Sequence, residues 1–214
     1  MDKIMPLIKI CGVRDKLIAK QAAMSGADFI GMVFYPASKR HIELTAAKEI
    51  TAATLDAGAI PVAVVVDTDI DEIMTICETT KISTVQLHGK ISRKKQAHLP
   101  AEIQRIYVCA VDKEGNITED NAEAIQQLDP NRDFLLFDNL QPGSGKPFNW
   151  ENFHYTGAFR WFLSGGLSPE NVAIAADKVN PFGVDVSSGV ESSPGIKNMP
   201  LIKNFINQVK SNYE

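Results

Sequence analysis

Apolar runs alternate with helix-like patterns along the whole chain. Eight short runs are rich in β-branched and aromatic residues, as expected for strands that are buried on both faces of a parallel sheet. They cover residues 7–11, 28–34, 60–67, 84–88, 105–111, 133–138, 160–164 and 183–187. Six other segments space their apolar residues as amphipathic helices do: residues 14–25, 45–57, 69–79, 118–128, 168–179 and 198–210. The pattern therefore predicts a repeated strand–helix unit.

The number of units favours one fold class. Eight units in 214 residues fit a small (β/α)8 barrel, a TIM barrel, whose lower size limit is roughly 200 residues. A doubly wound sheet usually has fewer strands and carries a glycine-rich nucleotide fingerprint, which this sequence lacks. The segments after the fourth and sixth strands give the shortest helix patterns, since 92–99 is short and basic and 148–153 has room for a single turn. We expect a single domain over residues 1–214.

Composition narrows the class of protein further. The chain has 22 Lys and Arg against 26 Asp and Glu, a formal net charge of −4, so it offers no broad basic face for nucleic acid or an anionic membrane. No apolar run approaches the ~18 residues that span a bilayer, and the N-terminus has no charged-then-apolar leader, which predicts a cytoplasmic location. The cysteines Cys11, Cys77 and Cys109 are widely spaced and predict free thiols.

The predicted strand ends carry the candidate chemistry, because catalytic residues of parallel barrels lie at the carboxyl ends of the strands. Cys11 ends the first strand and Asp138 ends the sixth. Alone, Cys11 would suit a packing residue and Asp138 a turn or helix cap. Together they predict a base and an acid on two sides of the barrel mouth, since burial raises the pKa of a carboxyl and so suits it to be a general acid.

Glycines and serines follow the last two strands. Gly165 and Gly166 come after the seventh strand, and Ser187, Ser188 and Gly189 come after the eighth. Glycines let the backbone approach a ligand closely, and loops at these two places form the phosphate site of many barrels. We therefore predict a phosphate cradle here, with two ordinary turns as the alternative.

Arg40 and His88 complete the predicted ring. The loop after the second strand carries Lys39, Arg40 and His41, and a guanidinium there suits bidentate binding of a carboxylate, although an isolated Lys-Arg pair is usually solvated. His88 ends the fourth strand and is expected to line the pocket. No Asp, His and Glu cluster indicates a metal site, and Asp67 is explained as a cap of the helix that follows it.

These residues lie within motifs that together resemble one family. The motifs are Lys9-Ile10-Cys11-Gly12, Gly26-Ala27-Asp28, Phe34-Tyr35-Pro36, Ser38-Lys39-Arg40, Val85-Gln86-Leu87-His88-Gly89, Leu136-Phe137-Asp138, Gly143-Ser144-Gly145-Lys146, Leu163-Ser164-Gly165-Gly166-Leu167, Pro169-Glu170-Asn171-Val172, Asp185-Val186-Ser187-Ser188-Gly189-Val190-Glu191 and Pro194-Gly195. In this order, over nearly the whole chain, they are similar to phosphoribosylanthranilate isomerase of tryptophan biosynthesis.

The resemblance implies a reaction and roles for residues. It implies an Amadori rearrangement of N-(5'-phosphoribosyl)anthranilate, a phosphosugar, to 1-(2-carboxyphenylamino)-1-deoxyribulose 5-phosphate, in a (β/α)8 barrel without cofactor or metal. We expect a monomer or homodimer. It implies that Cys11 is the general base, Asp138 the general acid and Arg40 the contact of the anthranilate carboxylate. A thiol with an ordinary pKa must be partly ionised to act as a base, which requires a lowered pKa or assistance by the substrate.

Two departures and three rival interpretations accompany this resemblance. Asn149 stands where the family usually has aspartate, and Pro142 where a second glycine is common; both concern the loop after the sixth strand. The histidine-pathway isomerase resembles a carboxylate pair with two phosphate loops, and thiamine phosphate synthase needs acidic residues for magnesium. A phosphosugar-binding barrel without activity would need neither Cys11 nor Asp138.

Overall fold

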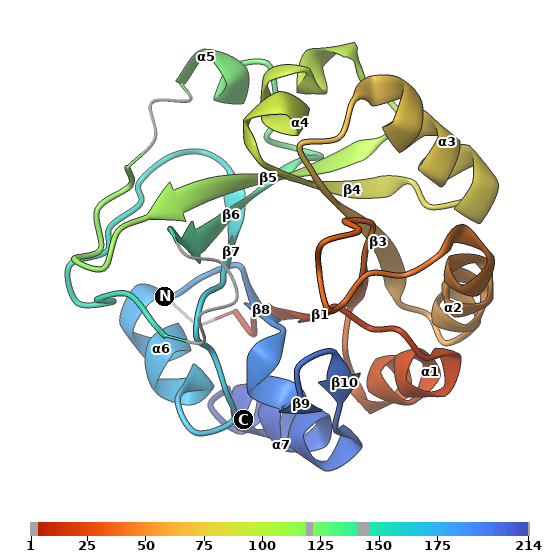
Figure 1. Ribbon diagram of the computed structural model, residues 1–214. Helices are drawn as coiled ribbons and strands as arrows, with labels where there is room; N and C mark the ends of the chain where they lie inside the picture. Colours follow the sequence, from red (N-terminus) through yellow and green to blue (C-terminus); the bar gives the residue numbers. More distant parts are fainter. Residues whose placement is uncertain (1–3, 119–121, 141–145, 214) are drawn as a thin grey trace.

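Eight parallel strands close into a barrel in the computed structural model, which describes residues 4–118, 122–140 and 146–213. Each strand pairs with the next along the chain, and β8 pairs with β1 (Figure 1). The strands are β1 Leu7–Cys11, β2 Phe29–Val33, β3 Ile60–Val66, β4 Thr84–His88, β5 Gln104–Val111, β6 Phe134–Asn139, β7 Arg160–Leu163 and β8 Gly183–Val186. The predicted (β/α)8 barrel is confirmed.

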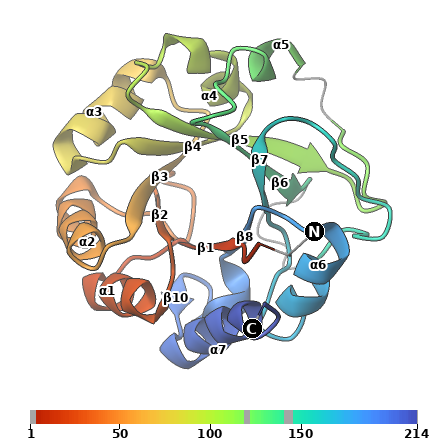
Figure 2. The ribbon, with the colours of Figure 1, turned by 180° about the vertical axis from the view of Figure 1, so that it is seen from behind.

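Helices form the outer layer, which surrounds the strands in both views (Figures 1 and 2). They are α1 Lys16–Ser25, α2 Leu44–Asp56, α3 Ile70–Thr80, α4 Lys90–Lys94, α5 Ala122–Ile125, α6 Val172–Val179 and α7 Met199–Lys210, with two short 3₁₀ helices, η1 Gln96–His98 and η2 Ser188–Val190. The caps show why a helix begins and ends where it does. The Asp15 carboxylate accepts hydrogen bonds from the backbone N–H groups of Leu17 and Ile18 in the first turn of α1. Gly26 ends the helix in a left-handed conformation, at φ 112°.

Strict alternation along the strands decides which side chains enter the barrel, because successive residues of a strand face opposite sides. On β6, Phe134 and Leu136 belong to the interior cluster, whereas Leu135 and Phe137 pack under the outer layer. Asp138 is in phase with the interior set and lines the cavity at the carboxyl end of the strand. The same phase governs every functional side chain described below.

Three phenylalanines fill the opposite, amino-terminal end of the barrel. The rings of Phe29, Phe134 and Phe162 meet edge to face, with centroid separations of 5.3–6.1 Å. Such contacts are favourable for aromatic quadrupoles and fill this end of the barrel with apolar side chains. The polar cavity lies at the other end, where the strands finish.

Aromatic side chains replace a helix outside β6. The segment 148–153, where the sequence left room for a single turn, contains one hydrogen-bonded turn and no helix. Phe137 instead contacts Phe153, Tyr155 and Trp161, with centroid separations of 5.0, 5.0 and 5.5 Å. The large rings cover the apolar outer face of the strand, so a helix is not needed there.

Two other predicted helices are shorter than expected. Within the segment 118–128, of which 119–121 lie outside the described residues, α5 covers only Ala122–Ile125. The segment 168–179 is helical only from Val172, because Asn171 uses its side chain to fold the preceding turn: its Oδ1 accepts from Ser168 N at 2.8 Å, and its Nδ2 donates to Gly166 O at 2.9 Å.

Asp67 caps a different helix from the one expected. The cap of α3 is Asp69, whose carboxylate accepts from Glu72 N at 3.1 Å. Asp67 lies in the left-handed region at φ 50° and accepts from Ile91 N, at the start of α4, at 2.9 Å. The carboxylate thus joins the loops after β3 and β4.

A hairpin that the pattern did not predict follows η2. It consists of β9 Glu191–Ser193 and β10 Ile196–Lys197, paired antiparallel outside the barrel. It lies beside the loop after β2, since Gly195 packs against the Lys39 carbonyl of that loop. Arg14 donates a hydrogen bond to the same carbonyl. Within the described ranges, no helix has both the length and the apolar character needed to cross a membrane.

Candidate active site

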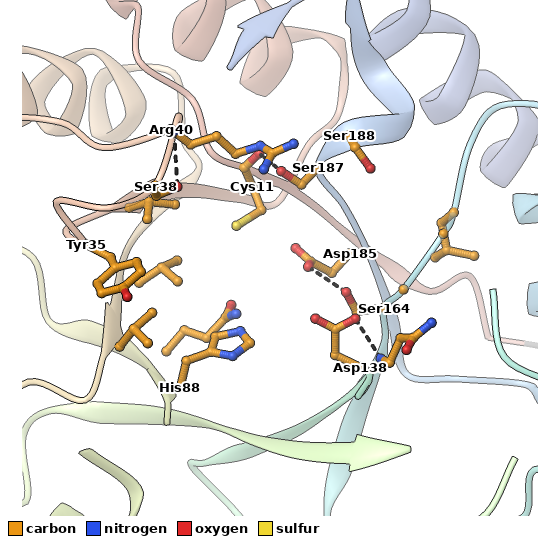
Figure 3. A pocket seen from close by; sticks show the side chains of 18 residues that line it. Cys11, Tyr35, Ser38, Arg40, His88, Asp138, Ser164, Asp185, Ser187 and Ser188 are labelled. Atoms are coloured by element: carbon orange, nitrogen blue, oxygen red, sulfur yellow. Dashed lines mark hydrogen bonds between the residues drawn. The ribbon is translucent and has the colours of Figure 1, made fainter. Parts of the chain in front are cut away.

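A cavity of about 390 Å³ opens at the carboxyl ends of the strands (Figure 3). Eight of the nine predicted site residues line it: Cys11, Arg40, His88, Asp138, Gly165, Gly166, Ser187 and Ser188. They come from six different strands or strand-end loops that are far apart in the sequence. The barrel therefore brings the predicted residues together in one site.

Gly189 is the predicted residue that does not line the cavity. It lies in η2, and a Cβ at this position would collide with the Leu167 carbonyl oxygen. Gly189 thus lets the loop after β8 pack directly against the loop after β7. The contact holds the two halves of the predicted cradle together.

Cys11 projects into the barrel beside a buried lysine. Lys9 lies two residues earlier on β1, is fully buried and donates to Asp185 Oδ1 at 2.7 Å. Its positive charge also acts on the nearby Cys11 thiol, whose pKa it lowers. Room for both side chains comes from Gly31 on β2, where a Cβ would lie 3.0 Å from the sulfur and 3.3 Å from Lys9 Nζ.

The thiol of Cys11 is neutral in the free protein at pH 7. Burial raises its pKa above the ordinary value, because the thiolate loses hydration. The cations Lys9 and Lys197 oppose the rise, and the negative charge of Asp185 adds to it. Burial thus outweighs the two cations and favours the neutral thiol in the free protein.

Asp138 has a pKa of about 7. Burial is the largest cause, since a carboxylate loses hydration in the barrel, and the nearby charge of Asp185 raises the pKa further. The opposing contacts are a hydrogen bond from Asn139 N at 2.8 Å and the hydroxyl of Ser164. A carboxyl that is half protonated at neutral pH can donate a proton to a substrate.

Ser164 connects the two sides of the cavity. Its hydroxyl donates to Asp185 Oδ2 at 3.1 Å (Figure 3), and it lies near enough to Asp138 to lower the pKa of that carboxyl. Asp185 in turn holds Lys9 next to Cys11. A continuous polar chain thus runs from the predicted acid to the predicted base.

His88 lines the cavity on the side opposite Cys11 in Figure 3. Burial lowers its pKa to about 4, and the positive charge of Lys9 contributes in the same direction. The imidazole is therefore neutral at physiological pH. A neutral ring can both donate and accept hydrogen bonds, which suits contact with substrate hydroxyls.

The two glycines of the predicted cradle adopt backbone conformations with positive φ. Gly165 and Gly166 lie at φ 89° and φ 69°, a region that side chains disfavour. A Cβ at Gly166 would collide with Pro147, and one at Gly165 would lie 3.0 Å from Asp138 Oδ1. Across the gap, Ser187 is fixed by a hydrogen bond from its hydroxyl to the Cys11 carbonyl oxygen at 3.1 Å.

Arg40 is held by an acidic residue that the sequence did not suggest for this purpose. Its Nε and Nη2 each donate to the Glu191 carboxylate at 2.8 Å. This ion pair raises the pKa of Arg40 above its ordinary value. Half of the guanidinium is thus occupied by the protein itself.

Lys9, Ser164, Asp185 and Glu191 were not predicted as site residues, although each stood in a quoted motif. Strand phase is the signal that could have found the first three. Lys9 lies two positions before Cys11, and Asp185 two before Ser187, so they share their interior face.

The predicted loop Gly143-Ser144-Gly145 and Pro142 lie outside the described residues. In the described part of the chain, no three His, Cys, Asp or Glu side chains are grouped to bind a metal ion.

The barrel and the residues of its cavity define a (β/α)8-barrel enzyme with its site at the carboxyl ends of the strands. The family model of N-(5'-phosphoribosyl)anthranilate (PRA) isomerase matches residues 8–208. The chain belongs to this family, as its motifs predicted.

Individual relatives agree. An N-(5'-phosphoribosyl)anthranilate isomerase of Chlamydia felis is 40% identical over 182 residues, which cover 85% of this chain and 85% of the relative. Monomers of the dimeric isomerase from Thermotoga maritima match with a TM-score of 0.78 and 33% identity, over 97% of this chain and 100% of that one. A PRA isomerase in complex with reduced 1-(o-carboxyphenylamino)-1-deoxyribulose 5-phosphate matches with a TM-score of 0.74 and 34% identity, over the same shares.

Proposed function

We propose that this chain converts N-(5'-phosphoribosyl)anthranilate to 1-(2-carboxyphenylamino)-1-deoxyribulose 5-phosphate, a step of tryptophan biosynthesis. One observation carries the proposal beyond family membership. Asp138, with a pKa of about 7, and Cys11 enter the same cavity from β6 and β1, beside a pair of glycine- and serine-rich loops. An acid, a base and an anion site in one cavity are what an aldose-to-ketose rearrangement of a phosphosugar requires.

Asp138 acts first, as the general acid. Its carboxyl proton passes to the furanose ring oxygen while the anthranilate nitrogen lone pair forms a C=N bond and the C–O bond of the ring breaks. The product of this step is an open-chain protonated Schiff base. The pKa of about 7 means that much of the free protein holds this proton at neutral pH.

Cys11 acts second, as the general base, on the carbon next to the Schiff base. Its thiol pKa is raised in the free protein, so the thiol must first lose its proton to water, and the bound substrate assists this ionisation. The positive Schiff base favours a nearby anion, and the ammonium of Lys9 does the same. Removal of the carbon-bound proton gives an enolamine, which tautomerises to the ketone.

The remaining roles follow the shape of the cavity. The phosphate lies between Gly165-Gly166 and Ser187-Ser188, with Gly189 holding the loops in contact. The anthranilate carboxylate meets Arg40 on the other side of the mouth. We further propose a cytoplasmic monomer or homodimer; the solved relative from Thermotoga maritima is described as dimeric.

The test is a spectroscopic assay with freshly made phosphoribosylanthranilate. Cys11→Ala and Asp138→Asn should each lower kcat by at least ~10²-fold, the lower end for loss of a general acid or base. Cys77→Ala, at a buried free cysteine outside the cavity, is the matched control and should keep wild-type kcat. Circular dichroism checks that each variant is folded. Near-normal turnover of Cys11→Ala or Asp138→Asn would remove that residue from its role.

A further inference from the structure

The hairpin β9–β10 holds the Arg40 side chain without lining the cavity. Glu191, with only 4% of its side chain exposed, accepts both hydrogen bonds from the Nε and Nη2 edge of Arg40. Lys197 donates to Glu191 Oε1 at 2.8 Å, and Gly195 N donates to Oε2 at 3.1 Å. The carboxylate is therefore fixed by the hairpin before it fixes the arginine.

Arg40 is also fixed along its stem and its backbone. A Cβ at Gly12 would lie 2.6 Å from Arg40 Cδ, so the arginine stem packs over the glycine that follows Cys11. The backbone N–H of Arg40 donates to Ser38 Oγ at 3.1 Å. With Glu191 at the head, the residue is held at three points, two on its side chain and one on its backbone. A long, rotamer-rich side chain is thus held in place before any ligand arrives.

The fixed orientation leaves one edge of the guanidinium available. A guanidinium can bind a carboxylate in a bidentate manner through its Nε–Nη edge or through its Nη1–Nη2 edge. Glu191 occupies the first of these. Among the described residues, Nη1 has no hydrogen-bond partner, and Arg40 lines the cavity. The Nη1–Nη2 edge is the one that a substrate can use.

The charges of the hairpin match an anionic substrate group. Glu191 carries one negative charge against the two positive charges of Arg40 and Lys197, which leaves a net charge of +1 in this cluster. Without the carboxylate, two cations would repel each other and the guanidinium would turn toward water. Glu191 thus decides both the direction and the strength of the positive charge that faces the cavity.

We infer that Glu191 is a specificity-determining positioning residue, which makes the enzyme select substrates whose aromatic amine carries a carboxylate. It does so by holding Arg40 with its Nη1–Nη2 edge toward the cavity. The inference deepens the proposed function and rests on the role given there to Arg40.

The experiment compares two substrates with Glu191→Gln, which keeps the size of the side chain and removes its charge. One substrate is phosphoribosylanthranilate, and the other is the adduct of aniline with ribose 5-phosphate, which lacks the carboxylate. We expect kcat/KM to fall about 10- to 100-fold for the first substrate, mainly through KM, because losing the partner that orients a ligating side chain has effects of this size. For the aniline adduct we expect a fall of less than about threefold.

The ratio of the two specificity constants keeps the test valid even if the variant folds poorly, because the fraction of active enzyme cancels in the ratio. Glu43→Gln, at an exposed glutamate just after the same loop, is the control and should leave the ratio unchanged. Equal losses for the two substrates, or no loss for either, would overturn the inference, since a residue that merely stabilises the fold affects both alike.

Arg40→Ala separates failure of the inference from failure of the proposed function. If Arg40→Ala lowers kcat/KM selectively for the carboxylate substrate and Glu191→Gln does not, only the inference fails. If Arg40→Ala lowers both equally, the proposed carboxylate contact itself is wrong. If Arg40→Ala and Glu191→Gln each lower kcat/KM selectively for the carboxylate substrate, the double variant should discriminate between the two substrates no less than Arg40→Ala alone does. This follows because Glu191 acts through Arg40.

Discussion

Asp138, the proposed general acid, shows how a buried carboxyl weakens the fold that carries it. The carboxyl is buried at the end of β6, which raises its pKa to about 7. In the unfolded chain the same group loses its proton near pH 4. Between these two values the folded protein binds one more proton than the unfolded chain, so the free energy of unfolding falls as the pH rises from about 4 to about 7.

Replacing this carboxyl should therefore stabilise the protein while it removes activity. Asp138→Asn stays neutral at every pH, so above pH 7 it should unfold with a free energy roughly 1 to 2 kcal/mol higher than that of wild type. Near pH 4 the difference should vanish. Urea unfolding of both proteins at pH 8 and pH 4 measures it.

Asp56→Asn provides the comparison for this measurement, because Asp56 is exposed at the end of α2. Its effect should be small and similar at both pH values. If Asp138→Asn were no more stable than wild type at pH 8, the carboxylate would be better solvated in the folded protein than its burial indicates.

At the scale of the element, strands were predictable because both faces are buried. The run 133–138 appears as Phe134–Asn139, and its apolar residues supply the barrel interior and the layer under the helices in strict alternation. After this strand the sequence left room for only a single turn, and the outer face is covered by Phe153 and Tyr155 from the following loop and by Trp161 from β7. Sequence periodicity predicts where helices and strands form, but it does not predict how the aromatic side chains of a loop pack.

The site was predictable where chemistry lies at a strand end, as for Cys11 and Asp138. Lys9 and Asp185 lie one layer deeper and pair across 176 positions of sequence. Nothing local indicates that pairing, because it depends on β8 closing against β1. The hairpin was missed since Glu191–Ser193 is short and polar and has no strand-like pattern.

The hairpin also offers a test at the scale of the element. Gly195 lies at φ 87°, and a Cβ there would lie 2.5 Å from the Lys39 carbonyl oxygen. Gly195→Ala should therefore push the hairpin from the loop that carries Arg40 and raise KM for phosphoribosylanthranilate severalfold, in addition to a backbone cost of about 1 kcal/mol.

Gly58→Ala separates the two effects of that substitution. Gly58 has a similar φ of 83° and no atom within 4 Å of a built Cβ. It should show the loss of stability alone, with KM unchanged. Equal KM values for both variants would mean that the hairpin can move without disturbing the loop. Thermal unfolding and steady-state kinetics on the same preparations give both quantities.

For the whole molecule, the cradle links ligand binding to the stability of the closed barrel. An anion that binds only the folded state raises the free energy of unfolding by about 2.7 kcal/mol at 100 times its Kd. Inorganic phosphate should therefore raise Tm more than sodium chloride does at the same ionic strength. Ser188→Glu, which places a negative charge in the cavity wall, should abolish the difference.

Ser193→Glu adds the same charge on the exposed hairpin and should retain the stabilisation by phosphate. A rise in Tm that persists in Ser188→Glu would place the anion elsewhere on the barrel. The orientation of the substrate proposed above would then have to be reversed or abandoned.

The closure of β8 on β1 has a consequence for how this enzyme comes into being. The Cys11 thiol, the proposed general base, leaves the ribosome with the first strand, whereas Asp185, Ser187 and Ser188 arrive with the last. A nascent chain that ends before β8 holds Cys11 beside a lysine that has no counter-ion and faces half of an anion site. Activity therefore begins in a single event near the end of synthesis, and no shorter fragment that lacks β8 inherits part of it.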